Sequence, residues 1–268
     1  MKQYTLRTGD NGQVVRDVQT ALGVVADGKF GPGTAEAVSR FQAQHGLVAD
    51  GIVGAQTFGA LGVAQPLPGI DVSHWQGAID WRAVAADGCR FAWAKVDALF
   101  HDNRINAASA GVPLGAYHFA DVTLDPVGCA TAFCVRVGML APGELVPMLD
   151  IEQAHNRSPA AIANWCLAWI TTCMDKLGRA PVVYTNNELR QMLYTGGFVP
   201  PGGVELWLAR YSGQTDDPDL PNAPWPGWTL WQWSDKGSVA GIAGDVDLDW
   251  LYGGESSLER LKVKKKAA

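Results

Sequence analysis

Short apolar segments alternate with stretches long enough for helices from residue 69 to the end of the sequence. This alternation is typical of β/α units, in which parallel strands are joined by helical crossovers. Eight segments predict strands, at 69–72, 91–96, 114–119, 146–151, 181–185, 206–210, 229–233 and 245–249. Eight such units predict a TIM-like (β/α) barrel, an α/β fold whose strands close into one sheet.

The predicted barrel spans residues 69–257 and is followed by a basic C-terminal tail at 258–268. About 190 residues is short for eight complete units. We therefore expect several crossovers to be short or irregular, especially those at 97–113 and 211–228.

Two other crossovers read as regular helices, at 127–139 and 158–177. In the second, Ser158 is suited to cap the helix and Pro159 to occupy its first position, because proline has no backbone N–H to leave unpaired there.

The first 62 residues contain an internal repeat, in which 25–38 aligns with 48–61 at an offset of 23 residues. Each copy opens with an Asp-Gly turn, and Thr34 and Thr57 stand where a capping residue would begin a helix. The spacing of apolar residues predicts a small all-α domain of three helices over residues 1–62.

A short linker stiffened by proline is predicted at 63–68. Charge is uneven along the chain: residues 1–65 are neutral, residues 66–257 carry a net charge of −10, and residues 258–268 carry +4. A body of this charge is not expected to bind nucleic acid, since that binding depends on positive contacts to phosphates.

No run of 18 apolar residues is present, so we expect no membrane insertion. The first residues lack the apolar core of a secretory signal, which predicts synthesis in a cytoplasm without export by that route. The histidines include no His-x-x-x-His pair, and we expect no metal and no other cofactor. Five cysteines form an odd set that predicts buried free thiols in a reducing compartment: Cys89, Cys129, Cys134, Cys166 and Cys173.

Two acids, Asp150 and Glu152, end the apolar run at 145–152. Alternation on a strand places them on one side, about 7 Å apart. Acids at the end of a buried strand are costly to desolvate, which favours a use for a proton donor beside a negative charge. The alternative is a strand end in solvent whose acids are simply hydrated.

In a barrel, the strand ends surround one pocket, so Asp71 from the first strand should lie near Asp150 and Glu152. Repulsion and partial burial should raise the pKa of at least one of these carboxyls toward neutrality. The last strand offers three acids on one face, and parity does not choose among them: Asp245, Asp247 and Asp249.

Seven motifs occur in order along the predicted barrel: GIDVSHWQG at 69–77, GAYHF at 115–119, DIE at 150–152, VYT at 183–185, LWLARY at 206–211, WQW at 231–233 and VDLD at 246–249. This ordered set resembles glycoside hydrolase family 25, the N-acetylmuramidase lysozymes. The resemblance implies Glu152 as the general acid, and Asp150 as the group that polarises the substrate's 2-acetamido group or stabilises positive charge. It also implies that Asp71 and Asp247 complete the acidic floor.

The reaction route stays open at this point. Carboxyl separations of ~5–5.5 Å favour a retaining route and ~6.5–9.5 Å an inverting one, while an N-acetyl substrate permits a substrate-assisted route. The resemblance favours the assisted route. Five residues are candidate substrate contacts, with packing in the barrel as the alternative for the aromatic ones: Tyr117, Tyr184, Trp207, Trp231 and Gln232.

Two features depart from the family pattern. Lys95-Val96-Asp97-Ala98 replaces a Thr-Glu-Gly segment in a shortened loop, and Asp249 replaces the asparagine that usually ends the last motif. Both put the contacts to individual sugars in doubt. His74 and His118 are expected to be structural hydrogen-bonding residues.

The N-terminal segment at 4–62 resembles a three-helix peptidoglycan-binding domain. Its motifs are LRTGDNG at 6–12, VQ at 18–19, DGKFG at 27–31, FQ at 41–42 and DGIVG at 50–54. The implied role is to hold the chain on the cell wall. A purely structural helical cap is the alternative.

Together these features predict an endolysin-type N-acetylmuramidase, a monomer whose partner is bacterial peptidoglycan. A bacteriophage enzyme of this kind is released to the wall by a separate permeabilising protein. The main alternative is a non-catalytic wall-binding protein with an inactive barrel, and the missing zinc ligands argue against an amidase or peptidase. The target bacterium and its peptidoglycan type are not predicted.

Overall fold

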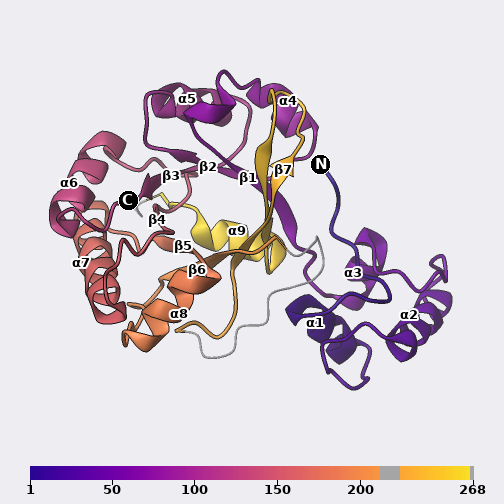
Figure 1. Ribbon diagram of the computed structural model, residues 1–268. Helices are drawn as coiled ribbons and strands as arrows, with labels where there is room; N and C mark the ends of the chain where they lie inside the picture. Colours follow the sequence, from indigo (N-terminus) through magenta and orange to yellow (C-terminus); the bar gives the residue numbers. More distant parts are fainter. Residues whose placement is uncertain (212–223, 266–268) are drawn as a thin grey trace.

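The computed structural model describes residues 1–211 and 224–265 (Figure 1). Within these residues a small helical unit precedes a closed barrel of eight strands, and Figure 1 shows the helical unit beside the barrel. The predicted fold class, a TIM-like α/β barrel preceded by a three-helix all-α domain, is therefore confirmed.

The helical unit contains α1 (Gln13–Ala21), α2 (Pro32–Gln44) and α3 (Ala55–Leu61). Its two repeats share one hydrogen-bonding pattern. Gln19 Nε2 donates to Thr34 Oγ1 at 3.0 Å, and Gln42 Nε2 donates to Thr57 Oγ1 at 3.1 Å. Both glutamines are buried, so each amide ties one helix to the first turn of the next.

The prediction that Thr34 and Thr57 cap their helices is wrong. The helices begin two residues earlier, after Gly31 and Gly54, and neither glycine supplies a side-chain cap. Pro32 occupies the first position of α2, where its missing N–H leaves nothing unpaired. The threonine hydroxyls lie inside the first turn and are used as acceptors for the buried glutamine amides.

The barrel strands pair in sequence order, and the first pairs with the last. They are β1 (Leu67–Val72), β2 (Phe91–Lys95), β3 (Leu114–Phe119), β4 (Met148–Ile151), β5 (Val182–Asn186), β6 (Glu205–Ala209), β7 (Leu230–Gly237) and β8 (Val246–Leu251). All eight overlap the predicted positions. Strand β1 begins two residues before the predicted barrel boundary, inside the predicted linker at 63–68.

One feature of the barrel was not predicted. Strands β1 to β7 run parallel to their neighbours, but β8 is antiparallel to both β1 and β7. The expectation that every strand presents its C-terminal end to the pocket is therefore wrong for β8. Its first residues, not its last, lie at the end of the barrel where the other strands finish.

Helices fill most crossovers. They are α4 (Trp81–Ala86), α5 (Phe100–Ser109), α6 (Pro126–Val137), α7 (Pro159–Leu177), α8 (Asn187–Thr195) and, after the last strand, α9 (Gly254–Leu261). The two helices predicted at 127–139 and 158–177 are confirmed, with Ser158 accepting a hydrogen bond as the cap of α7 and Pro159 in its first position.

The expectation of an irregular crossover at 97–113 is wrong, because α5 occupies ten of its residues. Phe100 and Asn103 of α5 are buried, and Asn103 Oδ1 accepts a hydrogen bond from Trp81 Nε1 of α4 at 3.1 Å. This packing stabilises α5. The amphipathic pattern of its sequence is weak, which is why the helix was not predicted. Most of the crossover at 211–228 lies outside the described residues.

Large aromatic side chains fill the barrel interior. Trp93 of β2 and Trp207 of β6 meet edge to face with ring centroids 5.0 Å apart. Trp93 Nε1 donates to the Val146 carbonyl at 3.0 Å, so its one polar atom is satisfied. From the far end of the barrel, Leu258 and Leu261 of α9 pack against this interior.

The helical unit packs directly on the barrel. Tyr4 and Trp250 of β8 form an edge-to-face pair at 5.1 Å, and both are buried. Tyr252 donates to Asp17 Oδ2 of α1 at 2.6 Å. Burial at this contact raises the pKa of Asp17. The prolines of the linker are thus accompanied by side-chain contacts that fix the two units to each other.

None of the helices found in residues 1–211 and 224–265 combines the length and apolar character needed to cross a bilayer.

Gly115 of β3 tests the packing of the barrel interior. A Cβ at this position would meet Trp93 Nε1 at 2.1 Å, so Gly115→Ala should lower the free energy of unfolding by about 2–3 kcal/mol. Denaturant unfolding at neutral pH measures the change. Gly202→Ala is the matched control, since nothing lies within 4 Å of its added Cβ, and it should change stability by less than about 0.5 kcal/mol. Equal effects of the two substitutions would contradict the packing described.

Candidate active site

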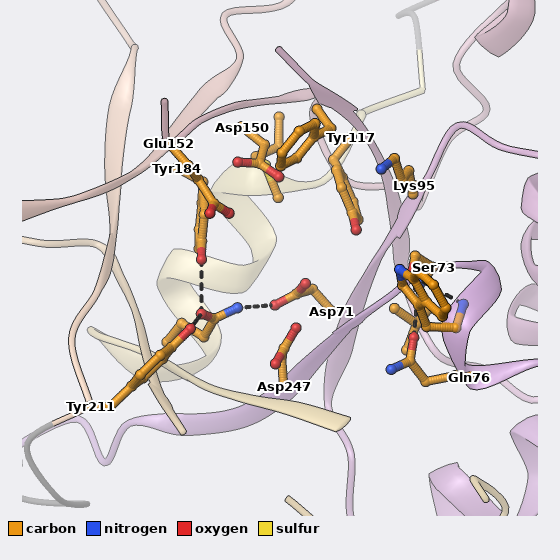
Figure 2. Close-up of a pocket in the computed structure, with 15 residues that line it drawn as sticks. Asp71, Ser73, Gln76, Lys95, Tyr117, Asp150, Glu152, Tyr184, Tyr211 and Asp247 are labelled. Atoms are coloured by element: carbon orange, nitrogen blue, oxygen red, sulfur yellow. Dashed lines mark hydrogen bonds between the residues drawn. The ribbon is translucent and has the colours of Figure 1, made fainter. Parts of the chain in front are cut away.

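Four acids meet in one cavity at the end of the barrel where β1 to β7 finish (Figure 2). Asp71 belongs to β1, Asp150 to β4 and Asp247 to β8, while Glu152 follows directly after β4. The cavity has a volume of about 220 Å³. The structure thus brings together the four acids that the sequence analysis named.

Asp71 and Asp247 face each other because they are register partners across the antiparallel β1–β8 pair. Burial, followed by the negative charge of Asp247, raises the pKa of Asp71 well above its ordinary value. Burial also raises the pKa of Asp247 to about 6. Two carboxyl groups in contact cannot both ionise freely, so this pair holds a proton in mildly acidic solution.

Asp150 and Glu152 form the second pair. Asp150 is buried, and burial together with the charge of Glu152 raises the pKa of Asp150 well above its ordinary value. Its Oδ1 atom makes no hydrogen bond to any described residue. Glu152 is only partly buried, and its backbone carbonyl accepts a hydrogen bond from Asn186 Nδ2 at 3.0 Å. One acid is therefore enclosed and the other stands at the cavity rim.

Gln232 of β7 links the acids to two tyrosines. Its Oε1 accepts hydrogen bonds from Tyr184 at 2.8 Å and from Tyr211 at 2.7 Å, and its Nε2 donates to Asp71 Oδ2 at 2.7 Å (Figure 2). Because both hydroxyls donate to the oxygen, the amide nitrogen must face Asp71. This donation favours the charged form of Asp71 and opposes the effect of burial.

The candidate substrate contacts divide into two groups. Tyr117, Tyr184 and Gln232 line the cavity, but Trp207 and Trp231 are absent from its described lining. Both tryptophans are fully buried, so the prediction that they face sugar is wrong. Their indole N–H groups are already used inside the protein: Trp207 Nε1 donates to Asp249 Oδ1 at 3.2 Å, and Trp231 Nε1 donates to the Arg210 carbonyl at 2.8 Å.

The three acids of the last motif lie at different depths. Asp245 precedes β8, is exposed, and pairs with Lys236 at 3.3 Å. Asp247 reaches the cavity, whereas Asp249 is fully buried beneath it. Burial raises the pKa of Asp249 well above its ordinary value. Because their numbers differ by two, these acids were expected on one face of the strand. Their different depths along the strand distinguish them.

Several lining residues were not among the candidates, and three of them carry large or charged side chains: Trp75, Lys95 and Tyr211. Lys95 ends β2, and its ammonium group lies 4.5 Å from the centre of the Phe119 ring. Each of the three stands at or just after the end of a predicted strand. In a barrel that position is the signal that could have identified them.

The two histidines of the motifs have different surroundings. The His118 ring stacks on Trp169 at 5.6 Å, and burial lowers its pKa to about 4, so it is a neutral packing residue. His74 is exposed and pairs with Asp97 at 3.2 Å. Neither lines the cavity as described.

The polar groups that line the cavity include carboxyls, hydroxyls, two amides and one ammonium group. Within the described residues, no cluster of histidine, cysteine and acidic side chains has the arrangement of a metal site. A carboxylic acid beside a carboxylate is instead the arrangement that donates a proton and stabilises positive charge.

A family model described as Glycosyl hydrolases family 25 matches residues 70–242, which is more than half of the chain. A second model, described as a putative peptidoglycan binding domain, matches residues 11–61.

Individual proteins are similar to the same two parts of the chain. The chain is 32% identical to Lysozyme M1 of Streptomyces globisporus over 209 residues, covering 71% of this chain and 69% of that protein. The structure of the lysozyme from Streptomyces coelicolor superposes with a TM-score of 0.67 at 31% identity, covering 73% of this chain and 96% of that one. The N-terminal unit is 43% identical over 62 residues to part of the Zinc D-Ala-D-Ala carboxypeptidase of Streptomyces albus G, covering 20% of this chain and 24% of that protein.

The Asp71–Asp247 pair predicts how stability depends on pH. The pKa of Asp247 is about 6 in the folded protein and 3.8 as its reference value, so folded protein keeps a proton that unfolded chain has released. The stabilisation from this proton is complete at pH values below the pKa of the unfolded chain. It is lost as pH rises through the pKa of the folded protein. The stability advantage of Asp247→Asn over the wild type should therefore grow by about 3 kcal/mol as pH rises from about 3.5 to about 8.

Denaturant unfolding at the two pH values measures this gain. Asp245→Asn removes the exposed acid two residues away and should leave the pH dependence of wild type unchanged. If the Asp247→Asn advantage is the same at both pH values, the raised pKa of Asp247 is refuted.

Proposed function

This chain belongs to the glycosyl hydrolases family 25, and we propose that it is an N-acetylmuramidase. It would cleave the β-1,4 bond between N-acetylmuramic acid and N-acetylglucosamine in bacterial peptidoglycan. The observation that carries the proposal is the convergence of Asp71, Asp150, Glu152 and Asp247 in one cavity. A set of enclosed carboxyls at the mouth of a barrel is suited to glycoside hydrolysis, which needs a proton donor and a stabiliser of positive charge.

We assign the general acid to Glu152 because its carboxyl is partly exposed at the rim, where a leaving glycosidic oxygen can reach it. Asp150 is enclosed beside it, and burial together with the charge of Glu152 raises the pKa of Asp150 well above its ordinary value. A raised pKa in this pair favours a retained proton, as general acid catalysis requires.

Asp150 is assigned to the substrate's 2-acetamido group. Asp150 lines the cavity, and its carboxyl would accept the acetamido N–H. This contact would turn the acetamido oxygen toward the sugar's anomeric carbon, which is the substrate-assisted route. Asp71 and Asp247 would form the floor of the cavity, with Tyr117 and Tyr184 above them.

The helical unit is proposed to hold the enzyme on the wall. The match of residues 11–61 to a peptidoglycan-binding model supports this role. The body of the protein carries most of the negative charge, so long-range attraction to an anionic wall would not supply the binding. A wall-binding unit fixed to the barrel supplies it by specific contact.

We further propose that the protein is a monomeric bacteriophage endolysin that lyses its host and has antimicrobial activity from outside. It would be made in the host cytoplasm and reach the wall after a separate protein permeabilises the membrane. The combination of a wall-binding unit with a glycosidase barrel supports this role. The five cysteines, all free thiols, fit synthesis in a reducing compartment.

A non-catalytic wall-binding protein is the competing proposal. It is disfavoured by the retention of all four carboxyls inside the cavity, because burying them without a use would only reduce stability.

Turnover on purified sacculi tests the assignment of Glu152. The wild type should release new reducing ends, and Glu152→Gln should lower that rate by at least about 100-fold, because the amide cannot donate the proton. Glu188→Gln changes an exposed acid of α8 in the same way and should retain wild-type activity.

Binding must be followed in the same experiment. Glu152→Gln should still sediment with sacculi, since the helical unit is unchanged. New amino groups in place of reducing ends would identify an amidase or peptidase and reject the muramidase. Full activity of Glu152→Gln would reject the role given to Glu152 alone.

A further inference from the structure

Trp75 is an exposed tryptophan at the edge of the acidic cavity. It lines the cavity, yet 81% of its surface is accessible. It lies in η1 (His74–Gln76), a single turn that directly follows β1. An exposed ring at the edge of a cavity is placed to contact a ligand there, and this one stands four residues after Asp71.

The turn that carries Trp75 is fixed by its own residues. Ser73 Oγ accepts a hydrogen bond from the Trp75 N–H at 3.3 Å, and Gln76 Oε1 accepts one from the Ser73 N–H at 2.9 Å. Gln76 Nε2 also donates to the Asp245 carbonyl at 3.1 Å, which ties the turn to the start of β8. The backbone beneath the indole is therefore held from both sides.

Asp97 holds the same turn from a third direction. It lies in the short loop after β2, and its Oδ2 accepts hydrogen bonds from the His74 N–H at 2.7 Å and from His74 Nδ1 at 3.2 Å. Its Oδ1 accepts from the Leu99 N–H at 2.9 Å, which fixes the carboxylate itself. The His74 ring lies against the Trp75 ring, with centroids 4.7 Å apart. Asp97 thus positions His74, and His74 supports one side of the indole.

Exposed aromatic rings flank the cavity. Tyr211 is 56% exposed and follows β6, and Figure 2 shows it across the cavity from Gln76, the neighbour of Trp75. A glycan strand lying over the acids would extend toward both rings. The face of a pyranose ring is apolar, and a rigid indole offers it a flat surface at little cost in conformational entropy.

We propose that Trp75 is a stacking platform for a sugar ring of the glycan strand outside the cleaved pair, and that Asp97 is the residue that positions it through His74. This inference rests on the proposed function, since it assigns a subsite to the same cleft. It predicts that the enzyme gains affinity from strands long enough to reach Trp75.

Steady-state kinetics on soluble glycan strands of defined length test the platform. With long strands, Trp75→Ala should raise KM about tenfold, which corresponds to about 1.4 kcal/mol, and should change kcat by less than about threefold. With a fragment limited to the cleaved pair and too short to reach Trp75, KM should match wild type. Trp75→Phe should recover part of the affinity. Tyr194→Ala removes an exposed ring of α8 outside the cavity and is the matched control.

The positioning role of Asp97 is tested by a double-mutant cycle. Asp97→Ala should raise KM for long strands, and the Trp75→Ala/Asp97→Ala double variant should be no worse than Trp75→Ala alone, because both changes remove one contact. Additive effects would assign Asp97 a separate structural role and reject its positioning role.

A binding measurement separates this inference from the proposed function. Calorimetric titration of long strands into Glu152→Gln and into the Glu152→Gln/Trp75→Ala double variant measures affinity without turnover. An equal Kd for the two variants refutes the platform even where wild type cleaves glycan. A wild type that releases no reducing ends refutes the muramidase, whatever the titration shows.

Discussion

The antiparallel pairing of β1 with β8 is the contact on which the site depends. It closes the barrel, and its register sets Asp71 opposite Asp247. Had β8 run parallel to β1, an acid near its start would have been carried to the opposite end of the barrel. The C-terminal ends of the other seven strands surround the cavity. Because β8 runs in the opposite direction, an acid near its start lies at that same end of the barrel. Burial raises the pKa values of both Asp71 and Asp247, and the negative charge of Asp247 raises that of Asp71 further.

Charge repulsion at the mouth is offset by dense packing below it. Tryptophans from β2 and β6 meet inside the barrel, where Gly115 leaves room for Trp93 and Gly69 leaves room for Phe91. Asp249 lies between these two regions: it is buried, and it accepts a hydrogen bond from Trp207 in the layer beneath the acids. Burial raises the pKa of Asp249, which disfavours an additional charge at that depth. The side chains inside the barrel thus change from apolar ones in its interior to acidic ones at its open end.

Sequence patterns predicted the strands well because buried parallel strands are short apolar runs, and each run here has clear boundaries. They predicted Asp71, Asp150 and Glu152 for the same reason, since each stands at or beside the end of such a run. The choice of Asp247 among the three acids of the last strand came from the family resemblance. They did not predict what depends on direction or depth. The alternation of side chains along a strand is the same for both directions of β8. It also carries no information on depth, so it could not show that Trp207, Trp231 and Asp249 lie below the cavity. The helix starts were misjudged because Thr34 and Thr57 bond to glutamines in a preceding helix, a non-local contact that capping preferences do not contain.

Strand β8 also connects the site to the helical unit. Asp247 near its start lines the cavity, while Trp250 near its end packs on Tyr4, and Tyr252 just beyond it bonds to Asp17. A strand in a closed barrel is rigid, so the two ends of β8 hold a fixed separation and direction. The orientation of the helical unit relative to the acids is then a property of the fold and does not depend on the linker alone. Wall polymer bound by that unit would meet the cleft at a set angle, because both surfaces are built on the same short piece of chain.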